Sequence, residues 1–416
     1  MTDTMYYLWL QCALGVSPAL RTQEILAAFA GGAREIFRAS DYERRLAGVF
    51  TNAQLARLQR TPLECAEKIL EECAWQNAHI LSPQDAGYPA RLLQIPSYPL
   101  ALYVRGSLDC LRDRLPLAVV GTRRASSKSV DIAARLCADL ANAGCAVVSG
   151  GALGIDSAAH WGALHANSAT VAVMGCGLDI TYPPENAALF RRIAEHGAVV
   201  SEYPFGEAPL AKNFPIRNRL ISGVAVGTVV IEAGEKSGSL RTAACANEQG
   251  RDVFAVPGDA FGSTYTGGNK LIRDGAKPVF SAMDVLEEYE LVYPELLDMR
   301  RAERDLERPS VNPEKVTVRK QPVGARRMAT RPEGGFLPPE QNKSRPPMPS
   351  EKPAPAPASL SPLEQQIMQL LANGPAHIDR IMKETGAPYG ELFAALMNLE
   401  LQESIQQAPG KMYTLS

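Results

Sequence analysis

The stretch Leu117-Ala118-Val119-Val120-Gly121-Thr122-Arg123 decides the fold class, because it is an apolar run of strand length that ends in a glycine turn. Similar apolar runs follow it along the chain, and helical patterns separate them. These runs are Ala146–Ser149, Thr170–Met174, Ala198–Glu202, Thr228–Glu232 and Val253–Val256. Apolar strands that alternate with helices are typical of a parallel sheet with helices on both faces. The sequence therefore predicts an α/β fold with a Rossmann-like, doubly wound parallel sheet.

Nearly every predicted strand ends in a turn rich in glycine. These turns are Gly121-Thr122-Arg123, Gly150–Gly154, Gly175-Cys176-Gly177, Ala233-Gly234 followed by Ser237-Gly238-Ser239, and Pro257-Gly258. In doubly wound sheets ligands bind outside the carboxyl ends of the strands, and glycine lets a phosphate approach backbone N–H groups. Cations and hydroxyls gather in the same regions, at Thr122, Arg123, Lys128, Lys212, Arg217, Lys236, Ser237, Ser239 and Thr242. We therefore expect one crevice that binds an anionic ligand.

The segment Asn213-Phe214-Pro215-Ile216-Arg217-Asn218-Arg219 combines groups that suit a nucleic acid. Pro215 fits the first turn of a helix, whose free N–H groups attract anions, and the two guanidinium groups match phosphate oxygens. Phe214 could stack a base beside them. Taken alone, the segment favours a structural explanation, in which both arginines pair with buried carboxylates such as Glu202 or Glu232 and the aromatic ring lies in the core.

A series of motifs, spread in order over residues 106–280, carries a resemblance to a known family. The motifs are Val119–Arg123, Ser149–Asp156, Tyr182–Asn186, Ser201–Pro204, Phe214–Gly223, Glu232-Ala233, Ser237–Ala243, Ala255–Gly258 and Gly268–Ile272. They resemble the DprA/Smf family, the DNA-processing proteins of natural transformation. The resemblance implies a cytoplasmic homodimer that binds single-stranded DNA and helps load the recombinase RecA onto it, with no known reaction catalysed.

The resemblance also implies roles for particular residues. Arg123 would bind the DNA backbone and Phe214 would stack a base, so that binding is sensitive to salt and only weakly selective for sequence. Many relatives place a lysine where this chain has Ala211, and Lys212 or Lys236 could supply that charge instead. The residues expected to bind single-stranded DNA are Gly121, Thr122, Arg123, Gly150, Lys212, Asn213, Phe214, Arg217, Asn218, Lys236, Ser237, Gly238 and Thr242.

Catalytic and metal sites have weaker support in the sequence. Ser149, Asp156 and His160 could form a nucleophile set, but Asp156 is placed to cap a helix that begins near Ile155. The chain has five histidines and no C-x-x-C motif, which argues against a metal site. Glu202 and Glu232 end strands and are expected to orient arginines or lysines. We therefore predict no catalytic residue, no metal and no cofactor.

Two enzyme classes remain as alternatives. The sheet also resembles the LOG-type phosphoribohydrolases, which cleave nucleoside monophosphates and use a P-G-G-x-G-T-x-x-E turn. The comparable turn here, Glu235–Thr242, lacks the leading Pro-Gly-Gly and ends in threonine in place of the carboxylate that acid–base chemistry needs. A NAD-linked dehydrogenase would need a G-x-G-x-x-G fingerprint, which is absent. The phosphoribohydrolase is kept as the second hypothesis.

The length of 416 residues predicts several domains. We assign residues 1–80 to a helical SAM-like domain, 81–290 to the sheet domain, 291–358 to a flexible linker and 359–416 to a winged-helix-like domain. The linker assignment depends on proline, because twelve of the 31 prolines lie between Pro309 and Ala358. In the last domain the expected third helix, Gly390–Leu401, carries no cation, which favours protein contact over reading of a DNA groove.

Composition limits the location of the protein and of its site. A net charge of −2 gives no overall basic signature, so a nucleic-acid site must be a local patch. Eight scattered cysteines suit a reducing cytoplasm, and no apolar run is long enough to span a membrane. The first residues lack the pattern of a signal peptide. We therefore expect a cytoplasmic protein with no membrane partner.

Overall fold

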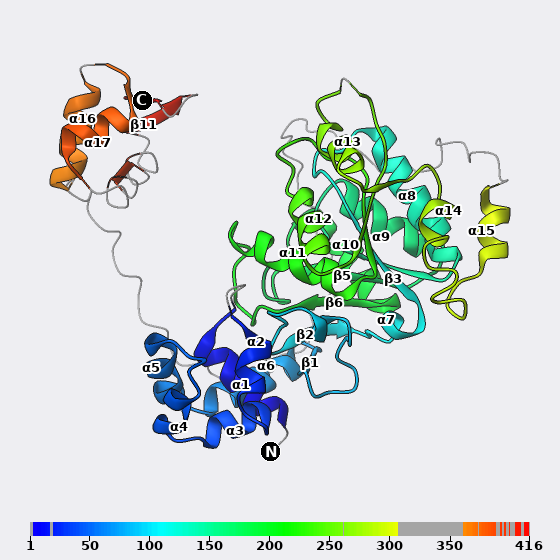
Figure 1. Cartoon of the computed structure of the whole chain (residues 1–416), viewed down its shortest axis with the longest axis horizontal. Coiled ribbons are helices and arrows are strands. Elements are labelled where there is room, and N and C mark those ends of the chain that lie inside the picture. The colour runs from blue at the N-terminus through cyan, green and yellow to red at the C-terminus, as the bar shows by residue number, and fades with distance from the viewer. Residues whose placement is uncertain are drawn as a thin grey trace, which may run out of the picture. The chain divides into compact units, whose positions relative to one another are not determined.

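The computed structural model describes residues 3–16, 20–260, 262–306, 361–372, 374–387, 392, 395–396, 399, 404–408 and 412–415. The chain divides into two compact units, Met1–Lys320 and Gln321–Ser416, which are treated separately below (Figure 1).

A single sheet runs through the first unit. In the described residues its order is β1-β2-β6-β5-β4-β3-β7-β8-β9. The strands are β1 His79–Leu81, β2 Leu102–Gly106, β3 Leu115–Val120, β4 Cys145–Ser149, β5 Thr170–Met174, β6 Ala198–Ser201, β7 Gly227–Val230, β8 Asp252–Ala255 and β9 Lys277–Pro278. Neighbours from β6 to β9 are parallel, whereas β1 and β2 add an antiparallel edge. The predicted doubly wound parallel sheet is confirmed.

Helices cover both faces of this sheet. They are α7 Cys110–Asp113, α8 Ser127–Asn142, α9 Ile155–His165, α10 Ala187–His196, α11 Asn213–Val224, α12 Ser239–Glu248, α13 Thr266–Arg273, α14 Met283–Leu286 and α15 Met299–Leu306, with 3₁₀ turns at Leu92–Gln94 and Pro184–Asn186. Alternate residues of β3 point to opposite faces, as the period of a strand requires. Leu117 packs in a cluster with α8 and α9, and Ala118 packs in another with α11 and α12.

The order of the strands creates a switch point between β3 and β7. From β3 the chain adds β4, β5 and β6 in one direction and then returns to add β7 and β8 on the other side. The connections therefore leave the carboxyl ends of β3 and β7 in opposite directions and open a crevice between them, which is where doubly wound sheets bind ligands.

The amino-terminal residues form a small helical bundle on the β1–β2 edge (Figure 1). Its helices are α1 Asp3–Leu14, α2 Thr22–Ala27, α3 Gly32–Arg38, α4 Asp41–Leu46, α5 Asn52–Arg60 and α6 Glu64–Trp75. Gln11 of α1 donates a hydrogen bond to the carbonyl of Glu202 and accepts one from the Tyr103 hydroxyl. The bundle and the sheet share one hydrophobic cluster, so they form a continuous body.

One part of the predicted linker is folded. Helix α15 lies within the segment 291–358, and its Ala302 is buried against the cluster that includes α8. The segment Met299–Leu306 has no proline and an apolar position that suits packing, which the composition argument overlooked. The rest of the predicted linker, from residue 307, lies outside the described residues.

The second unit contains α16 Pro362–Leu371, β10 Ala376–His377, α17 Ile378–Thr385, β11 Ile405–Ala408 and β12 Met412–Leu415. The strands form a small sheet in the order β10-β12-β11. Ser361 caps α16 through a reciprocal pair with Glu364. Most of the predicted third helix and the turn at Pro409-Gly410 lie outside the described residues.

Among the described residues, no helix combines the length and the apolar character needed to cross a membrane.

Candidate nucleic-acid interface

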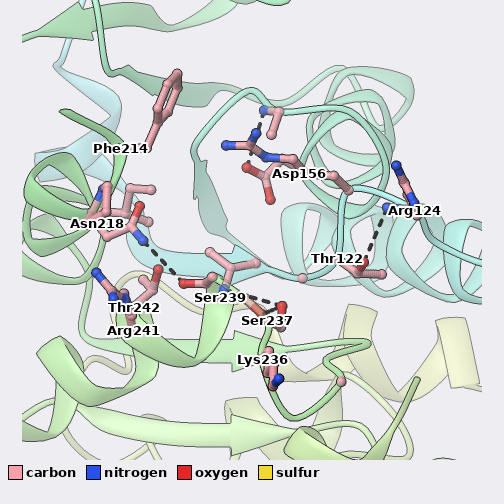
Figure 2. Close-up of a pocket in the computed structure, with 18 of the residues that line it drawn as sticks. Thr122, Arg124, Asp156, Phe214, Asn218, Lys236, Ser237, Ser239, Arg241 and Thr242 are labelled. Carbon is pink, nitrogen blue, oxygen red and sulfur yellow. Dashed lines mark hydrogen bonds between the residues drawn. The ribbon is translucent and has the colours of Figure 1, made fainter. Parts of the chain in front are cut away.

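A pocket of about 760 Å³ lies at the switch point, where the turns after β3 and β7 meet the start of α11 (Figure 2). Most of the predicted DNA-binding residues line it together. They are Gly121, Thr122, Arg123, Phe214, Arg217, Asn218, Lys236, Ser237, Gly238 and Thr242. Gly150, Lys212, Asn213 and the more distant Lys128 do not line it.

The charge of the pocket is positive. Its lining includes the cations Arg123, Arg124, Arg217, Lys236 and Arg241, whereas Asp156 is the one carboxylate among the described residues that line it. The pocket also divides into two halves. The turns after β3 and β7 supply three of the cations and the first turn of α12 supplies Arg241, whereas the segments after β4, β5 and β6 supply apolar groups such as Ala152, Tyr182 and Pro209. An elongated ligand with one charged edge and one apolar edge fits this division.

Phe214 lies between the two halves, partly exposed to the pocket. The guanidinium carbons of Arg123 and Arg217 lie 5.1 and 5.7 Å from its ring centroid, within the range of cation–π attraction. The absence of a side chain at Gly175 makes room for the ring, because a Cβ atom there would lie 3.1 Å from it. The phenylalanine is therefore held at the surface of the pocket and is not part of the core.

Arg217 is buried, with 3% of its surface exposed, and its guanidinium links two backbone segments, the turn after β4 and strand β5. Its Nη1 donates to the carbonyl of Gly150 at 2.9 Å and to that of Val173. A Cβ atom on Gly150 would lie 2.7 Å from both Arg217 and Asp156, so only glycine fits there. Burial lowers the pKa of Arg217 to about 10, against the opposing charge of Asp156. Its charge faces the pocket, but its Nη1 group is engaged by the backbone.

Burial also raises the pKa of Asp156, although the positive charge of Arg217 acts in the opposite direction. The carboxylate accepts a hydrogen bond from the backbone N–H of Ala152 at 3.3 Å and so braces the glycine turn at the start of α9. The predicted cap is wrong, because Gly154 is the N-cap residue of α9 and no side chain caps this helix; Asp156 lies in its first turn and stabilises the preceding loop instead.

The second arginine of the segment forms a buried ion pair. Arg219 Nη2 lies 2.7 Å from Glu202 Oε1, and both side chains are almost fully buried. The structural explanation offered for the arginines therefore holds for Arg219, which anchors α11 to the end of β6. Glu232 differs from expectation, because its carboxylate accepts from the backbone N–H of Ser126 at 3.1 Å and orients no cation in the described structure.

Two of the residues predicted to bind DNA, Lys212 and Asn213, are not placed to contact a ligand in the pocket. Asn213 is 2% exposed, and its side-chain amide donates to Glu207 Oε1 and the carbonyl of Ala208. It begins α11 and fixes the preceding loop. Lys212 is exposed but lies outside the lining, whereas its neighbour Ala211 is part of it. Of the two candidates for the absent family lysine, Lys236 is the one that lines the pocket.

The turn after β3 is fixed by backbone contacts. The N–H of Thr122 donates to the carbonyl of Glu232 at 2.8 Å, and Thr122 Oγ1 accepts from the N–H of Arg124 at 3.2 Å. Gly154 has a φ of +81°, and a Cβ atom on it would overlap the carbonyl oxygen of Thr122. The side chains of Arg123 and Arg124 remain exposed on this rigid turn.

The turn after β7 supplies the opposite wall (Figure 2). The hydroxyls of Ser237 and Ser239 lie 2.8 Å apart, and the side-chain amide of Asn218 donates to the carbonyl of Gly238 at 3.4 Å. Arg124 and Arg241 also line the pocket, although they were not among the expected ligands. Their signals were their positions, directly after Arg123 and directly before Thr242.

The residues considered for nucleophilic catalysis are engaged elsewhere. The Ser149 hydroxyl donates to the carbonyl of Val119 at 2.6 Å, and His160 Nδ1 lies 2.8 Å from Thr170 Oγ1. Burial lowers the pKa of His160 to about 3. In the part of the chain that the structure describes, no group of three or more His, Cys, Asp or Glu side chains is placed to hold a metal ion.

Comparisons with known proteins point in one direction. The family model of DNA recombination-mediator protein A matches residues 79–290, and that of the DprA winged helix domain matches residues 351–411. Protein Smf of Synechocystis is 34% identical over 83% of this chain and 82% of its own length. DNA processing protein DprA of Streptococcus pneumoniae is 44% identical over 50% of this chain and 72% of its own. The X-ray structure of DprA from Streptococcus pneumoniae covers 69% of this chain and 99% of that chain, with a TM-score of 0.60 and 34% identity. The resemblance and the winged-helix prediction are confirmed.

Proposed function

The chain belongs to the DprA/Smf family, the family of DNA recombination-mediator protein A, and on that premise we propose that it binds single-stranded DNA in the switch-point pocket. It does so without strong sequence preference and helps load RecA onto the strand during natural transformation and recombination. The proposal includes a homodimer in the cytoplasm and no catalysed reaction.

The observation that carries the proposal is the half-exposed ring of Phe214 beside a cationic wall. An aromatic ring stacks a base only when the base is free of its own stack, so such a ring favours single strands over duplex. Cations along one wall attract the phosphates of the same strand. Because every base has a π-face, the contact selects little among sequences.

The proposed contacts fall into two groups. Arg123, Lys236 and the neighbouring turns are assigned to the phosphates, since their side chains or backbone groups face the pocket. Arg217, Gly150 and Asn213 are assigned a positioning role, because their polar groups are engaged with the protein. Asp156, the one carboxylate in the described lining, is buried and accepts from the backbone N–H of Ala152, which favours a structural role over the acid–base role that a phosphoribohydrolase would need.

The test is fluorescence anisotropy of a labelled oligo-thymidine with the whole chain, in a salt series and against duplex competitor. Wild type is expected to bind tightly, to weaken with salt and to prefer the single strand. Phe214→Ala is expected to lose about 1–3 kcal/mol of binding free energy, the range of one stacked base. Phe280, which is 79% exposed and outside the pocket, gives the matched control Phe280→Ala.

Absence of binding, or equal binding to duplex, would overturn the proposal. Equal losses in the two phenylalanine variants would overturn the assignment of the pocket. The RecA step is tested separately, by the rate of RecA filament formation on a single strand with and without the protein.

A further inference from the structure

We propose that Tyr182 is a second base-stacking side chain, which receives the nucleotide next to the one on Phe214. This inference rests on the proposed function and adds a residue that was not among those expected to bind single-stranded DNA. Tyr182 lines the pocket, and its ring centroid lies 5.5 Å from that of Phe214 with an interplanar angle of 46°.

The spacing of the two rings decides how bases can use them. A base inserted between two rings needs about 7 Å, since each pair of stacked planes is separated by about 3.5 Å. The rings are closer than that and tilted, so no base fits between them. Two adjacent bases of one strand would therefore use the two rings separately, one base on each ring.

Tyr182 has the exposure of a ligand contact. Its side chain is half-buried, with its apolar body packed against the cluster that also contains Phe205. Among the described residues its hydroxyl has no hydrogen-bond partner, whereas the buried Tyr88 and Tyr103 hydroxyls donate to Pro99 and Gln11. A tyrosine that served only the core would be expected to satisfy its hydroxyl.

The loop that carries Tyr182 is held in place. Asn186, four residues later, donates from its side-chain amide to the carbonyl of Gly151 at 2.9 Å and to Ser157 Oγ at 2.8 Å. These bonds tie the loop to the glycine turn after β4. A preorganised ring loses little freedom when it binds a base, so more of the stacking energy appears as affinity.

The distribution of charge in the pocket indicates which side receives the phosphates of the DNA strand and which side receives its bases. Tyr182 belongs to the apolar half of the pocket with Ala152 and Pro209, and the exposed side chains of Leu153 and Leu210 adjoin these two lining residues. The cations of the turns after β3 and β7 lie on the other half. A strand whose phosphates follow the cations therefore presents its bases to Phe214 and Tyr182 together.

The experiment uses short strands of abasic residues that carry one thymine, two adjacent thymines or two separated thymines. Binding is measured by anisotropy with the full chain. For wild type, the first thymine is expected to raise affinity about fivefold or more, and an adjacent second thymine to raise it again by a similar factor. Separated thymines are expected to give a smaller second gain. This design does not depend on the register of the strand.

Tyr182→Ala and Tyr182→Leu are expected to lose the second gain and to keep the first, while Tyr182→Phe keeps both. The leucine variant preserves apolar packing in case alanine disturbs the fold. Tyr42→Ala, at a tyrosine that is 73% exposed on α4, is the matched control and is expected to keep both gains.

Loss of the first gain in Tyr182→Leu would show that the ring only supports Phe214, and it would overturn the inference. So would a wild-type protein in which an adjacent second thymine adds nothing. If wild type fails to bind an all-thymine strand at all, the proposed function itself fails, and that result is distinct from the other two.

Discussion

Arg123 and Arg217 both lie against the ring of Phe214, but only Arg123 has its side chain exposed. Arg217 is engaged by two backbone carbonyls. Arg123 is therefore the arginine that is free to meet a phosphate.

Arg123→Glu is expected to weaken binding of single-stranded DNA about tenfold or more, because a charged contact becomes a repulsion. The slope of log K against log salt should fall by about 0.7 or more. The far-ultraviolet circular dichroism should not change, since the residue lies on an exposed turn. Arg191→Glu, at an exposed arginine of α10 outside the pocket, is the control. Full binding by Arg123→Glu would refute the role assigned to this residue.

His160 makes stability depend on pH. Burial lowers its pKa to about 3 from the ordinary value of about 6.5, so between these pH values the unfolded chain binds a proton that the folded chain does not. The contribution of His160 to the free energy of unfolding is fully present above pH 6.5. It is lost as the pH falls, by about 1.4 kcal/mol per pH unit. His160→Gln is expected to remove that part of the slope in denaturant titrations between pH 6.5 and 5. An unchanged slope would contradict the assignment.

At the level of elements, the pocket depends on how closely two turns approach. Gly154, before α9, has a positive φ, and its position under Thr122 leaves no space for a Cβ atom. This contact fixes the turn that carries Arg123. The buried pair of Arg219 and Glu202 similarly fixes α11 to β6, so the pocket is built from braced segments.

Gly154→Ala is expected to destabilise the protein by more than Gly250→Ala. Both glycines have positive φ, but a Cβ atom on Gly250 meets nothing within 4 Å. Gly250→Ala should therefore cost only about 1 kcal/mol of backbone strain, whereas Gly154→Ala adds a steric clash and should cost about 2–4 kcal/mol. Denaturant unfolding measures both. Equal losses would show that the contact with Thr122 is not tight.

At the level of the whole molecule, every residue of the pocket belongs to the first unit, Met1–Lys320. A chain that ends at Lys320 is therefore expected to bind oligo-thymidine within about threefold of the full chain. Anisotropy with both proteins at one salt concentration tests this. A larger loss would assign part of the DNA contact to the linker or to the winged-helix domain.

The two arginines of α11 show why the site could be predicted only in part. Their spacing in the sequence suited a phosphate clamp, yet Arg219 pairs with Glu202 and Arg217 faces the carbonyls of Gly150 and Val173. Arg241 was not predicted because its position beside Thr242 does not by itself show that α12 directs it into the pocket. Exposure depends on segments that are distant along the chain.

By itself, the sequence determined the alternation of strands and helices and the glycine turns at the strand ends, because apolar periodicity and backbone freedom are local properties. It also predicted an anionic ligand, since cations and hydroxyls collect in and near those turns. Only the tertiary structure decided which of these groups are available. Tertiary packing brings together segments such as α11, β6 and the turn after β4. As a result Arg217, Arg219 and Asn213 are buried and engaged by protein groups, whereas Arg123, Phe214 and Tyr182 remain accessible in the pocket.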